Sequence, residues 1–242
     1  TILRFGCGPA TASSMPVFAA AIELSRWLAL HPQTRCTRLH APWQGHVPVR
    51  RNERRLVGLF RSPPQRLLSG YFHHEHGKNA SMIAPGMSDA QRALMRRHAR
   101  GDPAAYARWP GIAACATKML LGFQCAATHR PSRADISRAI RVVRQNFVFV
   151  GLQEHWKTSV CIFHARFING STPDAAELQL THAGPERLAG AARSEHGPDT
   201  LHLQAFRYDE GLLRGFVDEA DTLVYEAARS HFWQEAAATG CM

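Results

Sequence analysis

The chain has 242 residues, 45% of them hydrophobic and 20% charged, which is the composition of a soluble globular protein and a length that suits one α/β domain. Its formal net charge of +10 favours an anionic partner such as an acidic polysaccharide, a membrane surface or a phosphorylated cofactor, although a generally basic surface is also compatible with it. No apolar run approaches the roughly 20 residues that span a bilayer, and no zinc-finger spacing or RNA-binding aromatic signature is present, so nucleic acid is not the expected partner.

The N-terminal segment predicts a strand, a turn and a helix. Residues 1–5 form a short apolar run, and Gly6 to Pro9 is a cluster of turn residues. An apolar stripe at helical spacing follows from Val17 onward, and Ser13 or Ser14 can cap this helix.

The next elements are predicted to be a strand over Arg55–Arg61 and a helix after it. Ser62 can act as the N-cap, a proline follows at the first helical position, and Gln65 would complete a capping box. The apolar spacing predicts that this helix continues to about His76.

The central part of the chain alternates between helical and strand-like patterns. Helices are predicted over Asp89–Ala99, Ile112–Leu121, Ser132–Gln145 and Ser159–Phe167. The continuous apolar run Phe147–Leu152 predicts a strand that is buried on both faces.

Residues 170–198 show no clear periodicity and predict an irregular excursion, and one long helix is predicted from Gly211 to about Ala237. Strands that alternate with helices predict parallel β-α-β units. We therefore expect a single domain over residues 1–242, with a three-layer α/β fold in which helices flank a central parallel sheet. In such sheets ligands bind at the carboxyl ends of the strands.

The turn after the first predicted strand is suited to an anion. Gly6 and Gly8 let backbone N–H groups approach a phosphate, and the following helix dipole favours negative charge. The hydroxyl groups of Thr11, Ser13 and Ser14 could add hydrogen bonds. The turn lacks the GK[ST] ending of a Walker A loop, and a capped turn without a ligand is the alternative.

The second such turn carries a more specific pattern. Arg61 ends a predicted strand and Ser69 lies about two turns along the next helix, where an arginine and a serine together can bind a phosphate. The stretch Arg61–Tyr71, RSPPQRLLSGY, resembles the 3′-phosphate-binding motif of sulfotransferases that use 3′-phosphoadenosine 5′-phosphosulfate (PAPS). A capped amphipathic helix with a surface arginine is the alternative interpretation.

Three further segments resemble Golgi-type carbohydrate sulfotransferases, including the heparan sulfate 2-O-sulfotransferase group, and they occur in the family's order. They are Phe149–His164, Asp221–Phe232 and Ala116–Gly122, although Ala116 stands where the family usually has glutamine. The resemblance implies a P-loop-like fold and transfer of a sulfuryl group from PAPS to a hydroxyl of a carbohydrate, such as an anionic polysaccharide, or of another alcohol. It places the 5′-phosphosulfate on the Gly6–Ser14 turn, although that turn lacks the lysine that many family members carry.

The resemblance also implies a general base. The family carries a catalytic histidine in a Gly-His-Val sequence like that around His46, and His40 is the alternative. A histidine suits this task because its pKa lies near neutral pH. No metal is expected, and the histidine-rich run at residues 73–76 is interpreted as a helix end.

Cysteines and sequons bear on the compartment. Cys115 and Cys125 could close a short disulfide or remain core thiols, and Cys161 is expected to be a packing residue. The sequons at Asn79 and Asn169 favour a glycoprotein of the secretory route, such as the Golgi lumen. Any membrane attachment would come from a segment outside this sequence.

Two other functions remain open at this point. A non-catalytic basic module could bind an acidic polysaccharide through the positive charge alone. A divergent P-loop-like kinase for a small molecule would need a GK[ST] loop and a magnesium-binding aspartate, and neither is found in the sequence.

Overall fold

A computed structural model describes residues 56–72, 88–99, 101–175, 177–178 and 207–242. The predicted strand at residues 1–5, the turn after it and the following helix lie outside these ranges, as does most of the predicted excursion at 170–198. The elements below therefore concern the middle and the C-terminal part of the chain.

Two parallel strands form the sheet of the described residues, and both were predicted. Strand β1 (Leu56–Phe60) pairs with β2 (Phe147–Leu152), and Val57 lies opposite Phe149 in the register. Every residue of β2 except Val148 is buried, as expected for a strand covered on both faces. Parallel strands that each lead into helices establish a mixed α/β arrangement.

Gly58 in β1 lies directly beside the aromatic ring of Phe147, and a Cβ atom at this position would overlap that ring. Gly58→Ala is therefore expected to overpack the strand pair and to lower the free energy of unfolding by about 1–3 kcal/mol. Chemical denaturation would measure the loss, with Ser137→Ala on an exposed helix face as the control. A change no larger than that of the control would contradict the expected clash.

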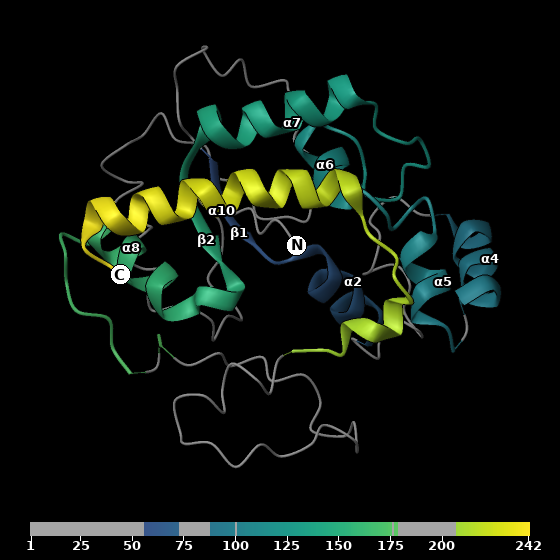
Figure 1. Cartoon of the computed structure of the whole chain (residues 1–242), viewed down its shortest axis with the longest axis horizontal. Helices are drawn as coiled ribbons and strands as arrows, with labels where there is room; N and C mark the ends of the chain where they lie inside the picture. Colours follow the sequence, from purple (N-terminus) through teal and green to yellow (C-terminus); the bar gives the residue numbers. More distant parts are fainter. Residues whose placement is uncertain (1–55, 73–87, 100, 176, 179–206) are drawn as a thin grey trace, which may run out of the picture.

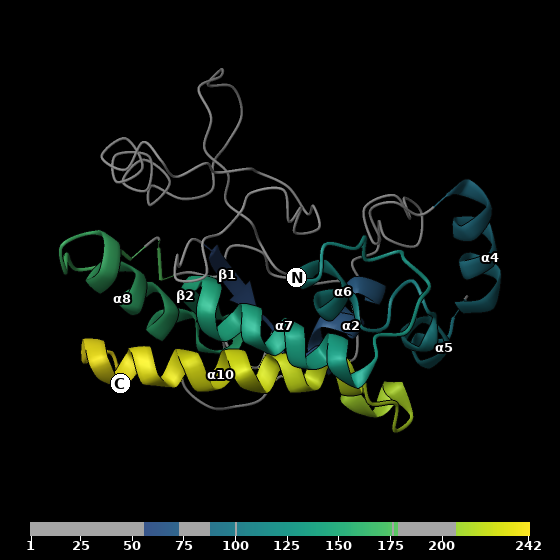
Figure 2. The same cartoon turned by 90° about the horizontal axis from the view of Figure 1, so that it is seen from above.

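Helices α7 (Arg133–Asn146) and α10 (Glu219–Thr239) lie side by side and cover one face of the sheet (Figures 1 and 2). Helix α7 begins as predicted, because the Ser132 side chain accepts a hydrogen bond from the Asp135 backbone and Asp135 completes a capping box. The two helices and the strands share one hydrophobic cluster, which includes Val143, Phe147, Val150, Leu152, Val224 and Phe232.

A second hydrophobic cluster lies beside the first, where α2 (Pro63–Phe72), α4 (Asp89–Ala99) and α5 (Pro103–Arg108) gather at one end of the molecule (Figure 1). Helix α4 has the predicted bounds. The cluster includes Leu67, Leu68, Met95, Tyr106, Ile112 and Leu213.

Two predicted helices have different bounds in the structure. Helix α6 spans only Cys115–Leu120, because Ala114 before it has a left-handed backbone with φ of 55°. The helix predicted from Gly211 to Ala237 is wrong as a single element. A 3-10 turn, η3 (Glu210–Leu213), comes first, and α10 starts only after Arg214 and Gly215, both of which have positive φ angles.

Helix α8 (Trp156–Phe167) follows β2 through the short 3-10 turn η2 (Gln153–His155), and begins before the predicted Ser159. A disulfide joins Cys161 in this helix to Cys241, the second residue after α10. Cys161 packs against the first hydrophobic cluster, as expected, and it also forms this disulfide, which was not predicted because its partner is far away in the sequence.

The other disulfide joins Cys115 to Cys125, which decides between the two alternatives left open for this pair. It closes a loop of ten residues around α6, so this short helix is held covalently at its N-terminus.

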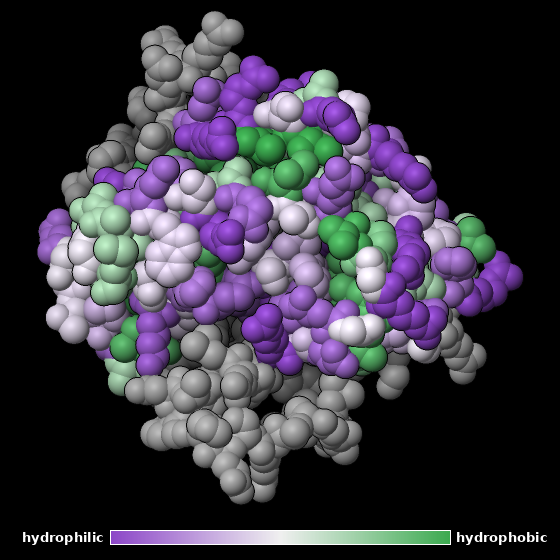
Figure 3. Space-filling model, viewed as in Figure 1, coloured by the Kyte–Doolittle hydropathy of each residue, from purple (hydrophilic) through white to green (hydrophobic). Residues whose placement is uncertain are grey.

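On the face shown in Figure 3, hydrophilic side chains cover most of the described surface and hydrophobic ones gather in small separate groups. Such groups are ordinary on a protein surface. Among the described residues no helix is both long and apolar enough to cross a bilayer.

Candidate functional site

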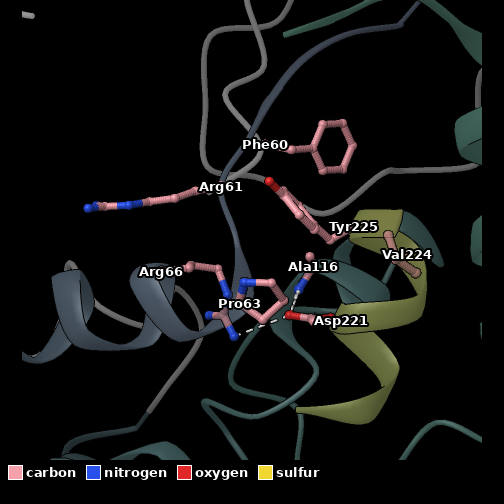
Figure 4. A pocket seen from close by; sticks show the side chains of 8 residues that line it. All are labelled: Phe60, Arg61, Pro63, Arg66, Ala116, Asp221, Val224 and Tyr225. Atoms are coloured by element: carbon pink, nitrogen blue, oxygen red, sulfur yellow. Dashed lines mark hydrogen bonds and ion pairs between the residues drawn. The ribbon is translucent and has the colours of Figure 1, made fainter. Parts of the chain in front are cut away.

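The carboxyl ends of β1 and β2 lie next to each other, because the strands are parallel and Phe60 pairs with Leu152. Arg61 follows β1 directly and leads into α2, while Glu154 follows β2 in η2. A small pocket opens here, and its lining residues are Phe60, Arg61, Pro63, Arg66, Ala116, Asp221, Val224 and Tyr225 (Figure 4).

Glu154 connects the two strand ends. Its Oε1 atom accepts a hydrogen bond of 2.6 Å from the backbone N–H of Ser62, the residue that precedes α2. The predicted capping box is therefore wrong: Glu154 takes the amide that Gln65 would have bound, and the Gln65 side chain bonds elsewhere. A carboxylate at a helix N-terminus is favoured by the helix dipole.

Burial, and after it the negative charge of Glu154, raises the pKa of Tyr225 in α10. Just beyond, the Oγ atom of Ser159 in α8 accepts a 2.9 Å hydrogen bond from the Leu152 backbone and lies 2.9 Å from the His155 carbonyl oxygen. These contacts fix the turn after β2 against the turn after β1.

Arg66 in α2 forms a buried ion-pair cluster with α10. Its Nη2 atom lies 3.1 Å from Oδ2 of Asp218 and 3.2 Å from Oδ2 of Asp221, and both carboxylate side chains are almost completely buried. In Figure 4 the Arg66 side chain points toward Asp221. A pair buried in this way is costly to break, since a lone charge would remain.

The same two carboxylates hold the start of α6. Asp221 accepts hydrogen bonds from the backbone N–H groups of Ala116 and Thr117, at 3.0 and 2.8 Å, and from the Thr117 hydroxyl at 2.8 Å. Asp218 accepts from the Ala114 backbone at 2.9 Å. These amides have no partner within the helix, so the aspartates satisfy donors that burial would otherwise leave unpaired.

Burial and the neighbouring Asp221 raise the pKa of Asp218 to about 6, against the opposing effect of Arg66. Nearby, the fully buried Lys118 donates hydrogen bonds of 2.7 Å to the carbonyl oxygens of Pro110 and Ala127, and burial lowers its pKa to about 8. Through these two hydrogen bonds Lys118 holds the segment before α6 against the segment after it.

Arg61 differs from Arg66 in its surroundings. Its guanidinium carbon lies 5.5 Å from the centre of the Tyr208 ring. Burial lowers the pKa of Arg61, but an arginine remains a cation at any physiological pH. In Figure 4 its side chain extends away from the other lining residues and out over α2.

Ser69, the second residue of the predicted phosphate site, lies in α2 and is partly exposed. It is four residues after Gln65 and three before Phe72, so the three share one face of the helix. Gln65, Phe72 and Arg61 all contact Tyr208, so Ser69 and Arg61 belong to the same side of α2.

The other predicted site residues lie outside the described ranges. They are the anion-binding turn with Gly6, Gly8, Thr11, Ser13 and Ser14, the candidate bases His40 and His46, and the histidine run at 73–76. Within the described ranges, no group of three or more metal-ligating side chains gathers at one point.

Three residues of the site were not predicted from the sequence: Arg66, Asp218 and Tyr208. Arg66 lies inside the RSPPQRLLSGY motif and Asp218 precedes Asp221 by three residues, so both were close to segments already singled out. Tyr208 had no local signal, because only the fold brings it to Arg61.

No protein-family model, curated protein or solved structure gives a significant match to this chain. What the site can do must therefore be argued from its own geometry. A fixed arginine at the carboxyl end of a parallel strand, with a serine on the same helix face, is suited to bind a phosphate group.

Proposed function

We propose that the protein is a PAPS-dependent sulfotransferase with a three-layer P-loop-like fold, and that it transfers a sulfuryl group to a hydroxyl of a carbohydrate or another alcohol. The observation that carries this proposal is the position of Arg61, which follows a parallel strand and shares one side of α2 with Ser69. In the proposal both residues bind the 3′-phosphate of PAPS.

The convergence of the other motif segments supports the same function. Three segments each resemble the sulfotransferase family. The first contains Glu154, the second contains Asp221 and Tyr225, and the third contains Thr117. All of them meet around the turn from β1 to α2, through Ser62 and Arg66. A shared binding site would explain why three segments that are far apart in the sequence all resemble the same family.

The proposed reaction is an in-line displacement at sulfur. His46 removes the proton of the acceptor hydroxyl, the acceptor oxygen forms a bond to sulfur, and the bond between sulfur and the phosphate oxygen of PAPS breaks. Adenosine 3′,5′-bisphosphate leaves with the electron pair of that bond. Backbone amides of the Gly6–Ser14 turn stabilise the charge on the transferring group.

A comparison of two nucleotides tests the proposal. Adenosine 3′,5′-bisphosphate is expected to bind in calorimetry and to raise the melting temperature of the full chain, whereas ATP at the same concentration has little effect. A preference for ATP would instead favour the kinase, and a response to neither nucleotide would favour the basic polysaccharide-binding module.

Turnover of PAPS tests the assignment of the base. His46→Ala is expected to reduce kcat by about 100-fold or more, because general base catalysis contributes about 10²–10⁴ to the rate. His40→Ala serves as the comparison and is expected to have a small effect. The opposite order would assign the base to His40.

We also propose that the protein matures in the secretory pathway, in the Golgi lumen or beyond. The two disulfides support this, since such bonds persist in oxidising compartments. The sequon at Asn169 is consistent with it, because Asn169 lies in an exposed turn after α8 and its backbone φ is 50°.

Asn169 is accordingly expected to carry an N-linked glycan when the chain is expressed in eukaryotic cells behind a secretion signal. Peptide mass spectrometry after enzymatic deglycosylation would identify the modified asparagine and separate it from Asn79. Ser171→Thr keeps the sequon and should keep the glycan, whereas Ser171→Ala should lose it. An unmodified Asn169 in the secreted, folded chain would contradict the expectation.

A further inference from the structure

Tyr208 is held against α2 by the side chain of Gln65, which is 4% exposed. The Gln65 amide nitrogen donates a 2.9 Å hydrogen bond to the Tyr208 carbonyl oxygen, and its amide oxygen accepts a 2.8 Å bond from the Tyr208 backbone N–H. The same nitrogen donates to Glu210 at 2.9 Å. Both ends of one buried side chain therefore fix the backbone of Tyr208.

The ring of Tyr208 is fixed as well. It stacks on Phe72 at the other end of α2, with ring centres 5.4 Å apart and an angle of 11° between the planes. The backbone and the side chain of Tyr208 thus each have a separate attachment to the same helix.

The guanidinium group of Arg61 lies over this fixed ring, 5.5 Å from its centre. A guanidinium group near an aromatic face is attracted by the ring quadrupole. An arginine side chain loses considerable rotamer entropy when it is ordered. An arginine that is already ordered before the ligand binds therefore loses less entropy on binding.

We propose that Tyr208 is a positioning residue that fixes the guanidinium of Arg61 for recognition of the nucleotide 3′-phosphate. This inference rests on the proposed sulfotransferase function and adds a residue that lies 147 positions after Arg61 in the sequence. It makes the affinity for the 3′-phosphate depend on the docking of Tyr208 on α2.

A comparison of nucleotides with and without a 3′-phosphate separates this role from direct contact with the nucleotide base. If the Tyr208 ring stacked on the base, its loss would weaken the binding of all adenine nucleotides equally. If it acts through Arg61, its loss weakens only nucleotides that carry a 3′-phosphate.

The experiment measures the affinities of adenosine 3′,5′-bisphosphate and adenosine 5′-monophosphate by calorimetry for the full chain. Tyr208→Leu is expected to weaken the binding of the bisphosphate by about 3- to 30-fold, which is the range of a partly desolvated cation–π contact. The affinity for the monophosphate is expected to stay unchanged. Tyr208→Phe keeps the ring and is expected to bind both nucleotides like the wild type.

A double-mutant cycle with Arg61→Ala completes the test. In the Arg61→Ala background, Tyr208→Leu should have no further effect on the bisphosphate, because the two residues act as one unit. Equal weakening of both nucleotides by Tyr208→Leu, or additive effects in the cycle, would overturn the inference. A wild type that does not bind the bisphosphate at all would instead remove the proposed function on which the inference rests.

A matched control is present in the same molecule. Arg108 lies 5.4 Å from the ring centre of Phe216 in a similar pair, and Phe216 packs against the second hydrophobic cluster. Phe216→Leu should therefore lower stability without changing the ratio of the two affinities. Tyr208→Leu could also lower the melting temperature and leave the ratio of the two nucleotide affinities unchanged. That result would show a purely structural role for Tyr208 and overturn the proposal.

Discussion

Asp221→Asn is expected to lower the free energy of unfolding by about 3–5 kcal/mol, the cost of breaking a buried ion pair. The asparagine would leave the Arg66 guanidinium without this charge, and its NH2 group would replace one of the two acceptor oxygens and face the backbone N–H of either Ala116 or Thr117. For a chain of this size the loss corresponds to a melting temperature lower by about 6–20 °C.

Asp135 provides the control, because it also caps a helix but does so from an exposed position. Asp135→Asn should lower stability only slightly in the same denaturation experiment. Thr117→Val tests one contact of Asp221 alone and is expected to cost about 1 kcal/mol. A loss for Asp221→Asn no larger than that for Thr117→Val would contradict the central role of the cluster.

Arg61→Ala is expected to weaken the binding of adenosine 3′,5′-bisphosphate by about 10- to 150-fold, the value of one hydrogen bond to a charged group. Arg61→Lys should recover only part of this affinity, because lysine keeps the charge but loses the planar, bidentate donor geometry. Adenosine 5′-monophosphate lacks the group that Arg61 binds in the proposal, so its affinity should not change.

Arg108→Ala is the matched control, since Arg108 has the same type of aromatic contact at a different place. It should leave both affinities unchanged. If Arg61→Ala weakened the binding of both nucleotides equally, Arg61 would contact another part of the nucleotide. Unchanged affinity for the bisphosphate would remove Arg61 from the site.

The strands and the helices with strong local signals could be predicted from the sequence. The continuous apolar run identified β2 because burial on both faces allows no polar position, and Ser132 identified the start of α7 because capping is a local interaction. The boundary at Arg214 and Gly215 was missed, because arginine carries no signal for a left-handed backbone and the apolar helical spacing from Phe216 onward outweighed the signal of Gly215.

Arg61 and Ser69 could be proposed from one short motif, whereas their surroundings could not. Gln65 fits a capping box by spacing alone, yet Glu154, which is 92 positions from Ser62, supplies the stronger acceptor. The partners of Arg66 are similarly distant, because Asp218 and Asp221 reach it only through the packing of α10. Local spacing cannot identify contacts that depend on the placement of whole helices.

The disulfide between Cys161 and Cys241 turns the last third of the chain into a covalent ring, and Tyr208, Asp221 and Tyr225 all lie within that ring. Closing a loop of this length lowers the conformational entropy of the unfolded chain, which stabilises the folded state by about 4–5 kcal/mol in the chain-entropy model. A reductant would open this ring and would also break the Cys115–Cys125 disulfide that holds the start of α6 beside the candidate site. The protein should therefore lose its resistance to proteolysis in the same concentration range of thiol in which its nucleotide affinity falls.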